Sequence, residues 1–415
     1  MKNRVVITGM DLLTPLGNGP EDFFDAALAG RCSITKIRKF DTSKFPVQIG
    51  GELCLPLETD TVASPIPMER LSEMPAVAKW AVIAARRAVL NAGLEIERED
   101  SFSIGVILGV GAPAFDVLEE QFVDLKERGP AFATPRIPIM LNPAAAAVQV
   151  SIDLGLHGEV VNISTACSSS ANAIGYALRL IQQGSASCVL TGGVDEGINP
   201  LFLGAFGNGS ILSRRNDDPV HASRPFDRQR DGYILSDAAC ILVLEEYDRA
   251  LARGANVYCE ITGFGASSDG VSPMKVGKSE EHGARALEKA LTGAQRTTAD
   301  IDYYCAHGSS SHWTDIRETR MIKRVFRERA SRLPVSSVKS MMGHPLGAAG
   351  AVQTAASALA IRHGAVPPTI NYEEHDPECD LDYIPNQARS IPVRNALVYS
   401  LGNGGNNTAL VLSAC

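Results

Sequence analysis

The chain has 415 residues, with 39 Lys and Arg against 47 Asp and Glu, so its formal net charge is −8. Hydrophobic residues make up 45% and charged residues 21%, which excludes an intrinsically disordered chain. At roughly 100–200 residues per domain, this length predicts two or three folding units or one large duplicated unit. The acidic balance, without a Lys/Arg-rich run, argues against a nucleic-acid partner. No stretch of about 18 apolar residues predicts a membrane span.

Short Val/Ile/Leu-rich runs alternate with Ala-rich amphipathic stretches along the whole chain. This alternation is typical of an α/β protein whose sheets are covered by helices on both faces. The N-terminal run predicts a strand rather than a secretory signal, because it is short and no cleavage site follows. Strands are expected, in chain order, over 4–8, 104–108, 160–163, 188–191, 240–244, 258–262, 303–306, 334–336, 397–400 and 409–412. Helices are expected over 75–92, 116–126, 169–183, 281–292, 315–327 and 348–363, and a long surface loop over 214–231.

Two sequence patterns recur in the two halves of the chain. A strand beginning Val-Val-Ile-Thr-Gly at 5–9 resembles the later one at 258–263, and the strands at 160–163 and 335–339 each lead through a reactive side chain into a Gly/Ala-rich helix. We therefore expect two copies of one βα unit, 1–250 and 251–415, joined near 250–256. The first half carries the candidate nucleophile described next, and the second carries the basic side chains.

The nine cysteines are scattered, odd in number and contain no C-x-x-C pair. They predict neither a disulfide framework nor a metal site, and they suit a reducing cytoplasm. Cys167 differs from the others because small polar residues surround it between a strand and a helix. Unpaired backbone N–H groups and the helix dipole are expected to favour its thiolate form and to stabilise an oxyanion. The alternative is a buried structural cysteine.

Three further segments carry chemistry. His307 ends a strand and precedes a hydroxyl-rich turn, and Lys339 lies five residues before His344 at a Gly-rich helix start. The glycines of 402–405 allow the backbone to turn N–H groups toward a ligand, but without a Lys or a G-x-G-x-x-G pattern they do not predict a phosphate site. A cysteine hydrolase would need only one histidine. Two imidazoles and an ammonium favour a reaction in which a carboxylate is lost as CO₂ and an enolate is stabilised.

With these motifs, the chain resembles the β-ketoacyl synthases, the thiolase-fold condensing enzymes of fatty acid and polyketide synthesis. The resemblance covers nearly the whole chain and is carried by the segments 165–169, 215–219, 222–227, 230–233, 306–308, 339–344 and 376–383. It implies an α/β thiolase-like fold of two duplicated halves in five layers, α-β-α-β-α. It also implies decarboxylative Claisen condensation of an acyl-Cys thioester with malonyl-acyl carrier protein.

The resemblance assigns roles residue by residue. It makes Cys167 the acyl acceptor, His307 and His344 the decarboxylation pair, and Lys339 the residue that holds that pair. The amides of Cys167 and Asn403 would form an oxyanion hole. The remaining assignments are pantetheine binding by Ser309 and Ser311, and an acyl pocket or gate formed by Asn403, Leu401, Ala112 and Phe206. No permanently bound cofactor or metal is implied, because the substrates ride on the phosphopantetheine of acyl carrier protein.

Three departures from the family pattern lie near one pocket. Asn403 stands where the family usually has a phenylalanine gate, Ala112 where a bulkier residue is common, and His312-Trp313 where smaller residues occur. Trp313 is either a wall of the pantetheine entrance or a buried aromatic. These changes favour a ketosynthase of a type II polyketide or polyene pathway, and the alternative is housekeeping long-chain fatty acid elongation. A silent partner subunit is disfavoured because Cys167 is present.

The expected partners are acyl carrier protein and a second subunit, giving either a homodimer or a heterodimer with a chain-length-factor-like protein. An acidic carrier protein would suit a basic helix face, although a merely solvated helix is the alternative. That candidate face comprises Arg317, Arg320, Lys323, Arg324 and Arg327.

Overall fold

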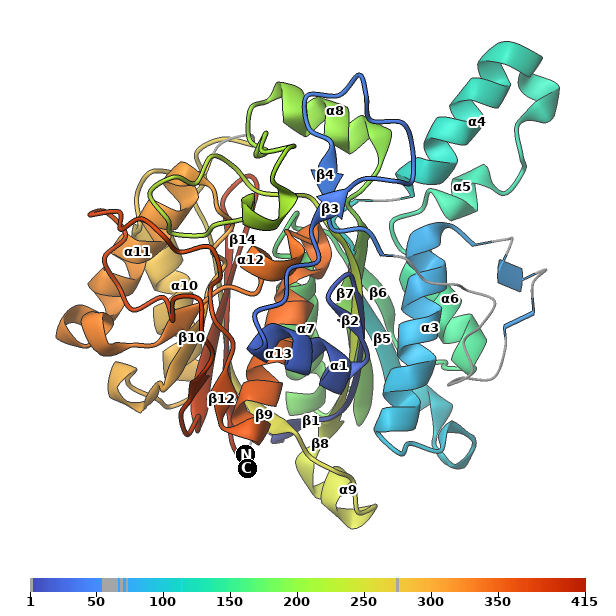
Figure 1. Ribbon diagram of the computed structural model, residues 1–415. Helices are drawn as coiled ribbons and strands as arrows, with labels where there is room; N and C mark the ends of the chain where they lie inside the picture. The colour runs from blue at the N-terminus through green and yellow to red at the C-terminus, as the bar shows by residue number, and fades with distance from the viewer. Residues whose placement is uncertain (1–2, 54–65, 68–69, 72–73, 113, 274–275) are drawn as a thin grey trace.

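The computed structural model describes residues 3–53, 66–67, 70–71, 74–112, 114–273 and 276–415. Within these ranges, eleven strands form one large sheet in the order β11-β10-β14-β15-β9-β1-β8-β7-β5-β6, with β2 paired to β1 (Figure 1). The strands are β1 (Val5–Thr14), β2 (Gly17–Asn18), β5 (Ile104–Gly109), β6 (Val160–Ile163), β7 (Cys188–Glu196), β8 (Asp237–Glu246), β9 (Cys259–Ser268), β10 (Tyr303–Cys305), β11 (Val335–Ser336), β14 (Asn395–Gly402) and β15 (Asn406–Ser413). Two small hairpin-like pairs, β3 (Thr35–Lys36) with β4 (Ile49–Gly50) and β12 (Ala365–Val366) with β13 (Arg389–Ser390), lie outside it.

The two ends of the sheet have the same pairing pattern. Strand β5 is parallel to β6 and β7, and β8 is antiparallel to β7 and β1. In the same way, β10 is parallel to β11 and β14, and β15 is antiparallel to β14 and β9. The two five-strand sets meet where β1 and β9 pair, at Val6 with Glu260 and Ile7 with Cys259. The two strand starts that resemble each other in sequence therefore lie side by side at the centre.

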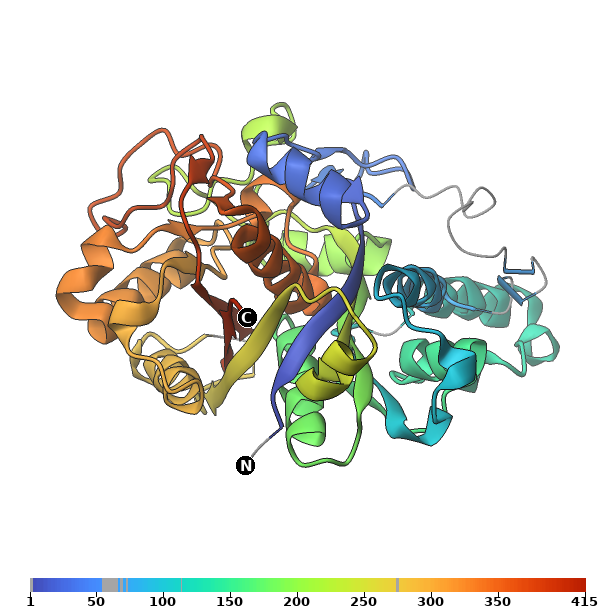
Figure 2. The same cartoon turned by 90° about the horizontal axis from the view of Figure 1, so that it is seen from below.

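Two helices, α7 (Ser169–Gln182) and α13 (Ala349–His363), pack between the two strand sets (Figures 1 and 2). Helices α3 (Ala76–Asn91) and α6 (Ala145–Leu154) cover the outer face of one set, and α10 (Glu281–Gly293) and α11 (His312–Phe326) cover the other. The first twelve residues of α13 are all buried, as expected of a helix packed on every side, and its many alanines let both sheets approach closely. The result is the expected α-β-α-β-α order of five layers.

The predicted helices agree with α3, α7, α10 and α13 to within one residue at each end. Several strands, among them β1 and β7, are longer than predicted, and glycines lie inside both. Gly9 is one of them: a Cβ there would lie 2.5 Å from the carbonyl oxygen of Ala88 in α3, so glycine permits close strand–helix packing. Helices α1 (Pro20–Leu28), α8 (Pro200–Asn208) and α9 (Tyr247–Ala252) were not predicted. Helices α4 (Phe115–Arg128) and α5 (Ile137–Met140) form an excursion from the body of the molecule (Figure 1).

No helix in the part of the chain described here has both the length and the apolar character needed to cross a membrane.

Candidate active site

Cys167 lies in the short loop between β6 and the start of α7 and is 7% exposed. Small polar side chains fold this loop back on itself: the backbone N–H of Thr165 donates to Ser169 Oγ at 2.9 Å, and Ser169 Oγ donates to the carbonyl of Ala166 at 2.6 Å. Ala166 has a φ of 55°, a left-handed conformation that alanine rarely adopts and that is typical of functional sites. This turn places Cys167 at the mouth of α7, as the sequence predicts.

The groups around Cys167 shift the pKa of its thiol in opposite directions. Burial raises its pKa to about 11, and nearby Asp195 adds to the increase. The backbone N–H groups of Asn403 and of Cys167 itself hydrogen-bond the sulfur and lower the pKa, as does the ammonium of Lys339. The expectation that the free enzyme favours the thiolate is therefore wrong, because desolvation outweighs the amides and the cation. The two amides nevertheless converge at the sulfur, where oxyanion donors are required.

His307 follows β10 and is held from both sides. Its ring Nδ1 accepts a 3.2 Å hydrogen bond from the backbone N–H of Leu401, and its own carbonyl accepts one of 2.6 Å from Lys339 Nζ. The pKa of His307 is well below the ordinary value, first because of burial and then because of the Lys339 cation. The ring is therefore neutral, and with Nδ1 acting as acceptor its proton lies on Nε2.

His344 follows the short helix α12 (Lys339–Met342), and its ring lies 5.2 Å from that of His307 at an interplanar angle of 82°. Its backbone is fixed by two hydrogen bonds to the segment before β8: its N–H donates to Ile234 at 2.7 Å, and its carbonyl accepts from Ser236 at 3.1 Å. Burial lowers the pKa of His344 well below the ordinary value, followed by the effect of Lys339. Its Nδ1 has no hydrogen-bond partner among the described residues, so this nitrogen remains available.

Lys339 is 2% exposed and links the two histidine segments. Burial lowers its pKa to about 8, while the nearby acidic groups oppose that shift. Its ammonium also lies 3.4 Å from Oε1 of Gln353, whose amide donates to the carbonyls of Ala306 and Tyr399. The lysine therefore holds the strand end that carries His307.

Glu318 and Asp195 are buried carboxylates near the site that sequence reasoning did not identify. Glu318 on α11 accepts the backbone N–H groups of His307 and Gly308, both at 2.8 Å. Asp195 at the end of β7 accepts the N–H groups of Gly111, Ala112 and Gly347. Burial raises the pKa of each carboxyl to about 7. For Asp195, the available sequence signal was an acid four residues after the end of the predicted strand 188–191.

The glycine-rich turn between β14 and β15 lies against the nucleophile loop. A Cβ on Gly402 would be 2.3 Å from the carbonyl oxygen of Thr165, so only glycine fits there without displacing the loop. Ser400 Oγ donates to the carbonyl of Cys167 at 3.2 Å. The Asn403 side chain is exposed, whereas Leu401 is 4% exposed.

The predicted acyl-pocket residues lie in different environments. Ala112 is 4% exposed and is tied to Asp195 through its N–H. Phe206 on α8 is half-buried and lies between Phe202, at a ring distance of 5.1 Å, and Tyr233, at 6.3 Å. These aromatic rings pack against the same apolar cluster as Cys167.

The predicted pantetheine residues border the turn after His307. Ser309 is 3% exposed, and its N–H donates to Asp315 at 3.1 Å, while Ser311 is half-buried at the start of α11. Trp313 is 65% exposed, so the alternative of a buried aromatic is wrong, and its ring faces Lys278.

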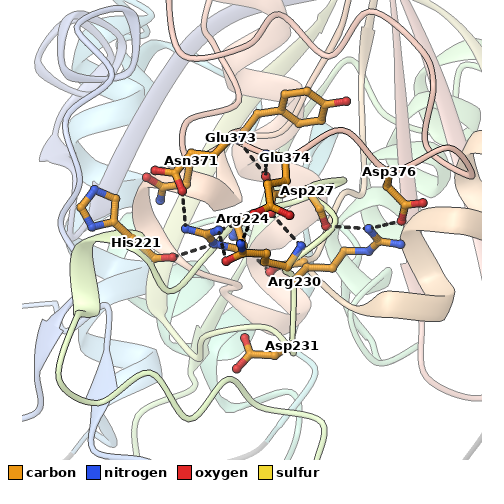
Figure 3. Close-up of polar contacts among 12 residues, drawn as sticks. His221, Arg224, Asp227, Arg230, Asp231, Asn371, Glu373, Glu374 and Asp376 are labelled. Atoms are coloured by element: carbon orange, nitrogen blue, oxygen red, sulfur yellow. Dashed lines mark hydrogen bonds and ion pairs between the residues drawn. The ribbon is translucent and has the colours of Figure 1, made fainter.

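The loop over 214–231 was predicted to lie on the surface, but residues 222–227 and Arg230 in its second half are buried. Arg224 and the side chain of Arg230 are enclosed by acids: Arg230 donates to Asp376 at 2.7 Å, and Asp227 accepts the N–H groups of 373 and 374 (Figure 3). The backbone N–H of Arg224 donates to Ser310 Oγ at 3.1 Å. The ion pairs thus join two motifs of the sequence and fix the loop beside the histidine turn.

The candidate basic face on α11 is not a free cationic surface. Arg317 is 4% exposed and pairs with Asp269 at 2.7 Å. Three of the other cations each pair with an acid from a neighbouring segment, namely Arg320 with Glu378, Lys323 with Asp380 and Arg324 with Glu280. Because each of these cations is paired with an acid, the face has little net positive charge left to attract an acidic partner.

Comparisons with known proteins agree with this geometry. The family models "Beta-ketoacyl synthase, N-terminal domain" and "Beta-ketoacyl synthase, C-terminal domain" match residues 2–250 and 258–373. A putative polyketide beta-ketoacyl synthase 1 of Streptomyces halstedii is 38% identical, with 100% of this chain and 98% of the relative aligned. The 3-oxoacyl-[acyl-carrier-protein] synthase 2 of Synechocystis sp. is 39% identical, with 99% and 97% aligned.

Solved structures are similar over the full length. One is a type II PKS acyl-carrier protein in complex with its ketosynthase bound to the hexaketide, with a TM-score of 0.92 and 30% identity. Another is the ishigamide ketosynthase/chain length factor, with a TM-score of 0.91 and 30% identity, and each covers 100% of both chains. The chain therefore belongs to the β-ketoacyl synthase family, has its thiolase-like fold and is a condensing acyltransferase.

Proposed function

We propose that Cys167 takes an acyl chain from acyl carrier protein and that the enzyme condenses it with malonyl-acyl carrier protein. In the first step the Cys167 sulfur attacks the donor thioester, a new thioester forms, and the phosphopantetheine thiol leaves with the proton of Cys167. The amides of Cys167 and Asn403 stabilise the oxyanion of this step, since both already hydrogen-bond the sulfur.

In the second step the two neutral histidines act on the malonyl thioester. The Nε2–H of His307 and an N–H of His344 donate to the thioester oxygen as the carboxylate leaves as CO₂ and an enolate forms. The enolate carbon then attacks the acyl carbonyl, a C–C bond forms, and the Cys167 thiolate leaves and is reprotonated. Lys339 is not placed to bond this oxygen, because its ammonium is directed to the His307 carbonyl; it positions the pair. Ser309 and Ser311 remain the residues proposed to bind the pantetheine arm.

The observation that carries this proposal is the shared end of β14. Leu401 donates to His307, and two residues later Asn403 donates to Cys167, so one strand end joins the decarboxylating and acylating groups.

Mass spectrometry tests the proposed function. The wild-type protein should form an acyl adduct and release CO₂ from malonyl-carrier protein, whereas Cys167→Ala should lose the adduct and keep CO₂ release. No adduct on the wild type, alone or with a partner subunit, would contradict the proposal.

We further propose that the pathway is a type II polyketide or polyene pathway. The polyketide relative and structures support it, although the 39% identical relative from Synechocystis equally supports fatty acid elongation. Asn403 at the gate position favours admission of polar, unsaturated or oxygenated acyl chains, with Leu401, Ala112 and Phe206 forming the rest of the pocket. Unchanged acyl-chain preference in Asn403→Phe, measured by loading from carrier proteins, would remove this support.

The assembly follows from the same comparisons. One similar structure holds an acyl-carrier protein and another is a ketosynthase with a chain length factor, which supports a carrier-protein partner and a heterodimer, with a homodimer as the alternative. The two strand sets with matching pairing support the division into halves 1–250 and 251–415.

The eight cysteines that the structure describes are free, which fits a cytoplasmic enzyme. Substrates carried on phosphopantetheine leave no step that requires a permanently bound cofactor.

A further inference from the structure

Tyr233 belongs to a sequence motif that the roles above leave without a function. Its backbone is rigidly placed: its N–H donates to Ile211 at 3.2 Å, and its carbonyl accepts from Ser213 at 3.1 Å. The preceding Gly232 has a φ of 144° and approaches Leu212 so closely that a Cβ would lie 2.5 Å from its carbonyl carbon. The next residue, Ile234, accepts the His344 N–H. Tyr233 is therefore fixed relative to the catalytic histidine.

The Tyr233 ring enters the space around the nucleophile. It meets the His344 ring at 5.4 Å and the Phe206 ring at 6.3 Å, both edge to face, and it is 9% exposed. It packs in the same apolar cluster as Cys167, Leu203 and Leu346. Burial raises the pKa of Tyr233 well above the ordinary value, and the nearby Cys167 adds to this, so the phenol keeps its proton.

The hydroxyl of Tyr233 has no hydrogen-bond partner among the described residues. Four other buried tyrosines have one: Tyr303 pairs with Ser336, Tyr383 with Thr319, Tyr399 with Asn407 and Tyr258 with Asn91. A fifth, Tyr304, has a fully buried hydroxyl without a partner, whereas the Tyr233 hydroxyl is not among the fully buried unpaired atoms and so keeps surface that a ligand can reach. A ligand oxygen that accepts from this hydroxyl gains a hydrogen bond that a methylene group cannot make.

We propose that the Tyr233 hydroxyl donates a hydrogen bond to an oxygen near the thioester of the acyl chain on Cys167, and so selects 3-oxoacyl over saturated chains. The inference rests on the proposed acyl-Cys167 intermediate. An acyl chain that runs from the Cys167 sulfur toward Phe206 enters the apolar cluster that holds Tyr233, Leu203 and Leu346. A 3-oxo group there satisfies the phenol, whereas a methylene leaves it unpaired.

A competition experiment tests this. Equal amounts of butyryl- and 3-oxobutyryl-carrier protein are offered to the enzyme, and the two Cys167 adducts are separated by intact-protein mass spectrometry at early times. The wild type should favour the 3-oxo chain by about tenfold. Tyr233→Phe should lose the preference and load the two chains equally. Tyr258→Phe, which removes a hydroxyl bonded to Asn91 instead, is the matched control and should keep it.

Two results would overturn the inference: equal loading of the two chains by the wild type, or an unchanged preference in Tyr233→Phe. If the unchanged preference is accompanied by slower CO₂ release from malonyl-carrier protein, the hydroxyl is assigned to the malonyl group instead. Equal loading by the wild type overturns the inference even if the variant does not fold. Failure of the proposed function itself gives a different result, because then neither donor leaves an adduct on Cys167.

Discussion

The backbone N–H of Leu401 donates to Nδ1 of His307 at 3.2 Å, and this bond sets the chemistry of the ring. A neutral imidazole that accepts at Nδ1 carries its proton on Nε2 and is a donor there. Because Asn403, two residues further, donates to Cys167, a change in the β14–β15 turn alters both the tautomer and the oxyanion donors.

The tautomer of His307 can be measured directly. Burial and Lys339 hold its pKa well below the ordinary value, so lowering the pH from about 8 to about 6 should leave the ring neutral with the proton on Nε2. Nitrogen NMR of the histidine-labelled enzyme, with the signal assigned by its loss in His307→Gln, checks this. A doubly protonated ring at about pH 6, or a proton on Nδ1, would contradict the geometry.

The raised pKa of Cys167 predicts a steep pH dependence of its reactivity. With a pKa of about 11, the thiolate fraction of the free enzyme rises about tenfold per pH unit through the neutral range. Iodoacetamide labelling, resolved by peptide mass spectrometry, should therefore accelerate tenfold per unit from about pH 6 to about pH 9. A plateau below about pH 8 would show that the amides of Cys167 and Asn403 dominate over burial.

Removing the Glu318 carboxylate should destabilise the protein. Glu318→Ala leaves the N–H groups of His307 and Gly308 unsatisfied in the interior, at about 1–3 kcal/mol each. The free energy of unfolding in urea should fall by about 2–5 kcal/mol and less in Glu318→Gln, which keeps one acceptor oxygen. Glu328→Ala, at an exposed site, should change it by less than about 0.5 kcal/mol. Equal stabilities of the two alanine variants would refute the role of Glu318.

Asp195 should act as a positioning residue for His344. Its carboxylate joins the loop after β5 to Gly347, three residues beyond that histidine, and Asn cannot accept all three N–H groups because its own NH₂ would face one of them. Asp195→Asn should lower kcat for CO₂ release about tenfold, since displaced catalytic groups lose rate, with a smaller change in KM.

The matched control for this prediction is Asp153→Asn, whose buried carboxylate pairs with Arg86 on the outer face of the sheet. It should lower stability without changing kcat. If both variants lose activity only in proportion to their loss of folded protein, Asp195 has a structural role and no positioning role.

Local sequence patterns predicted most of the long helices and strands and the positions of the four candidate reactive groups. Cys167, His307 and His344 were placed correctly because each follows a strand or helix end and precedes small residues or glycine, and such junctions are local features. Helices α3, α7, α10, α11 and α13 of the three helical layers were likewise readable from apolar periodicity, whereas α6 (Ala145–Leu154) was not predicted. Shorter helices such as Pro200–Asn208 were not, since few turns carry little periodic signal.

Only the tertiary structure decided how these groups are surrounded. The pKa of Cys167 rises because other segments bury it, Arg317 leaves the surface because Asp269 meets it, and the loop at 224–230 is enclosed by acids from 373–376. Glu318, Asp195 and Tyr233 contact distant segments of the chain; Asp195 and Gly347, for example, are 152 residues apart. Desolvation and hydrogen bonding depend on which distant residues share a space, and that information does not lie in any local pattern.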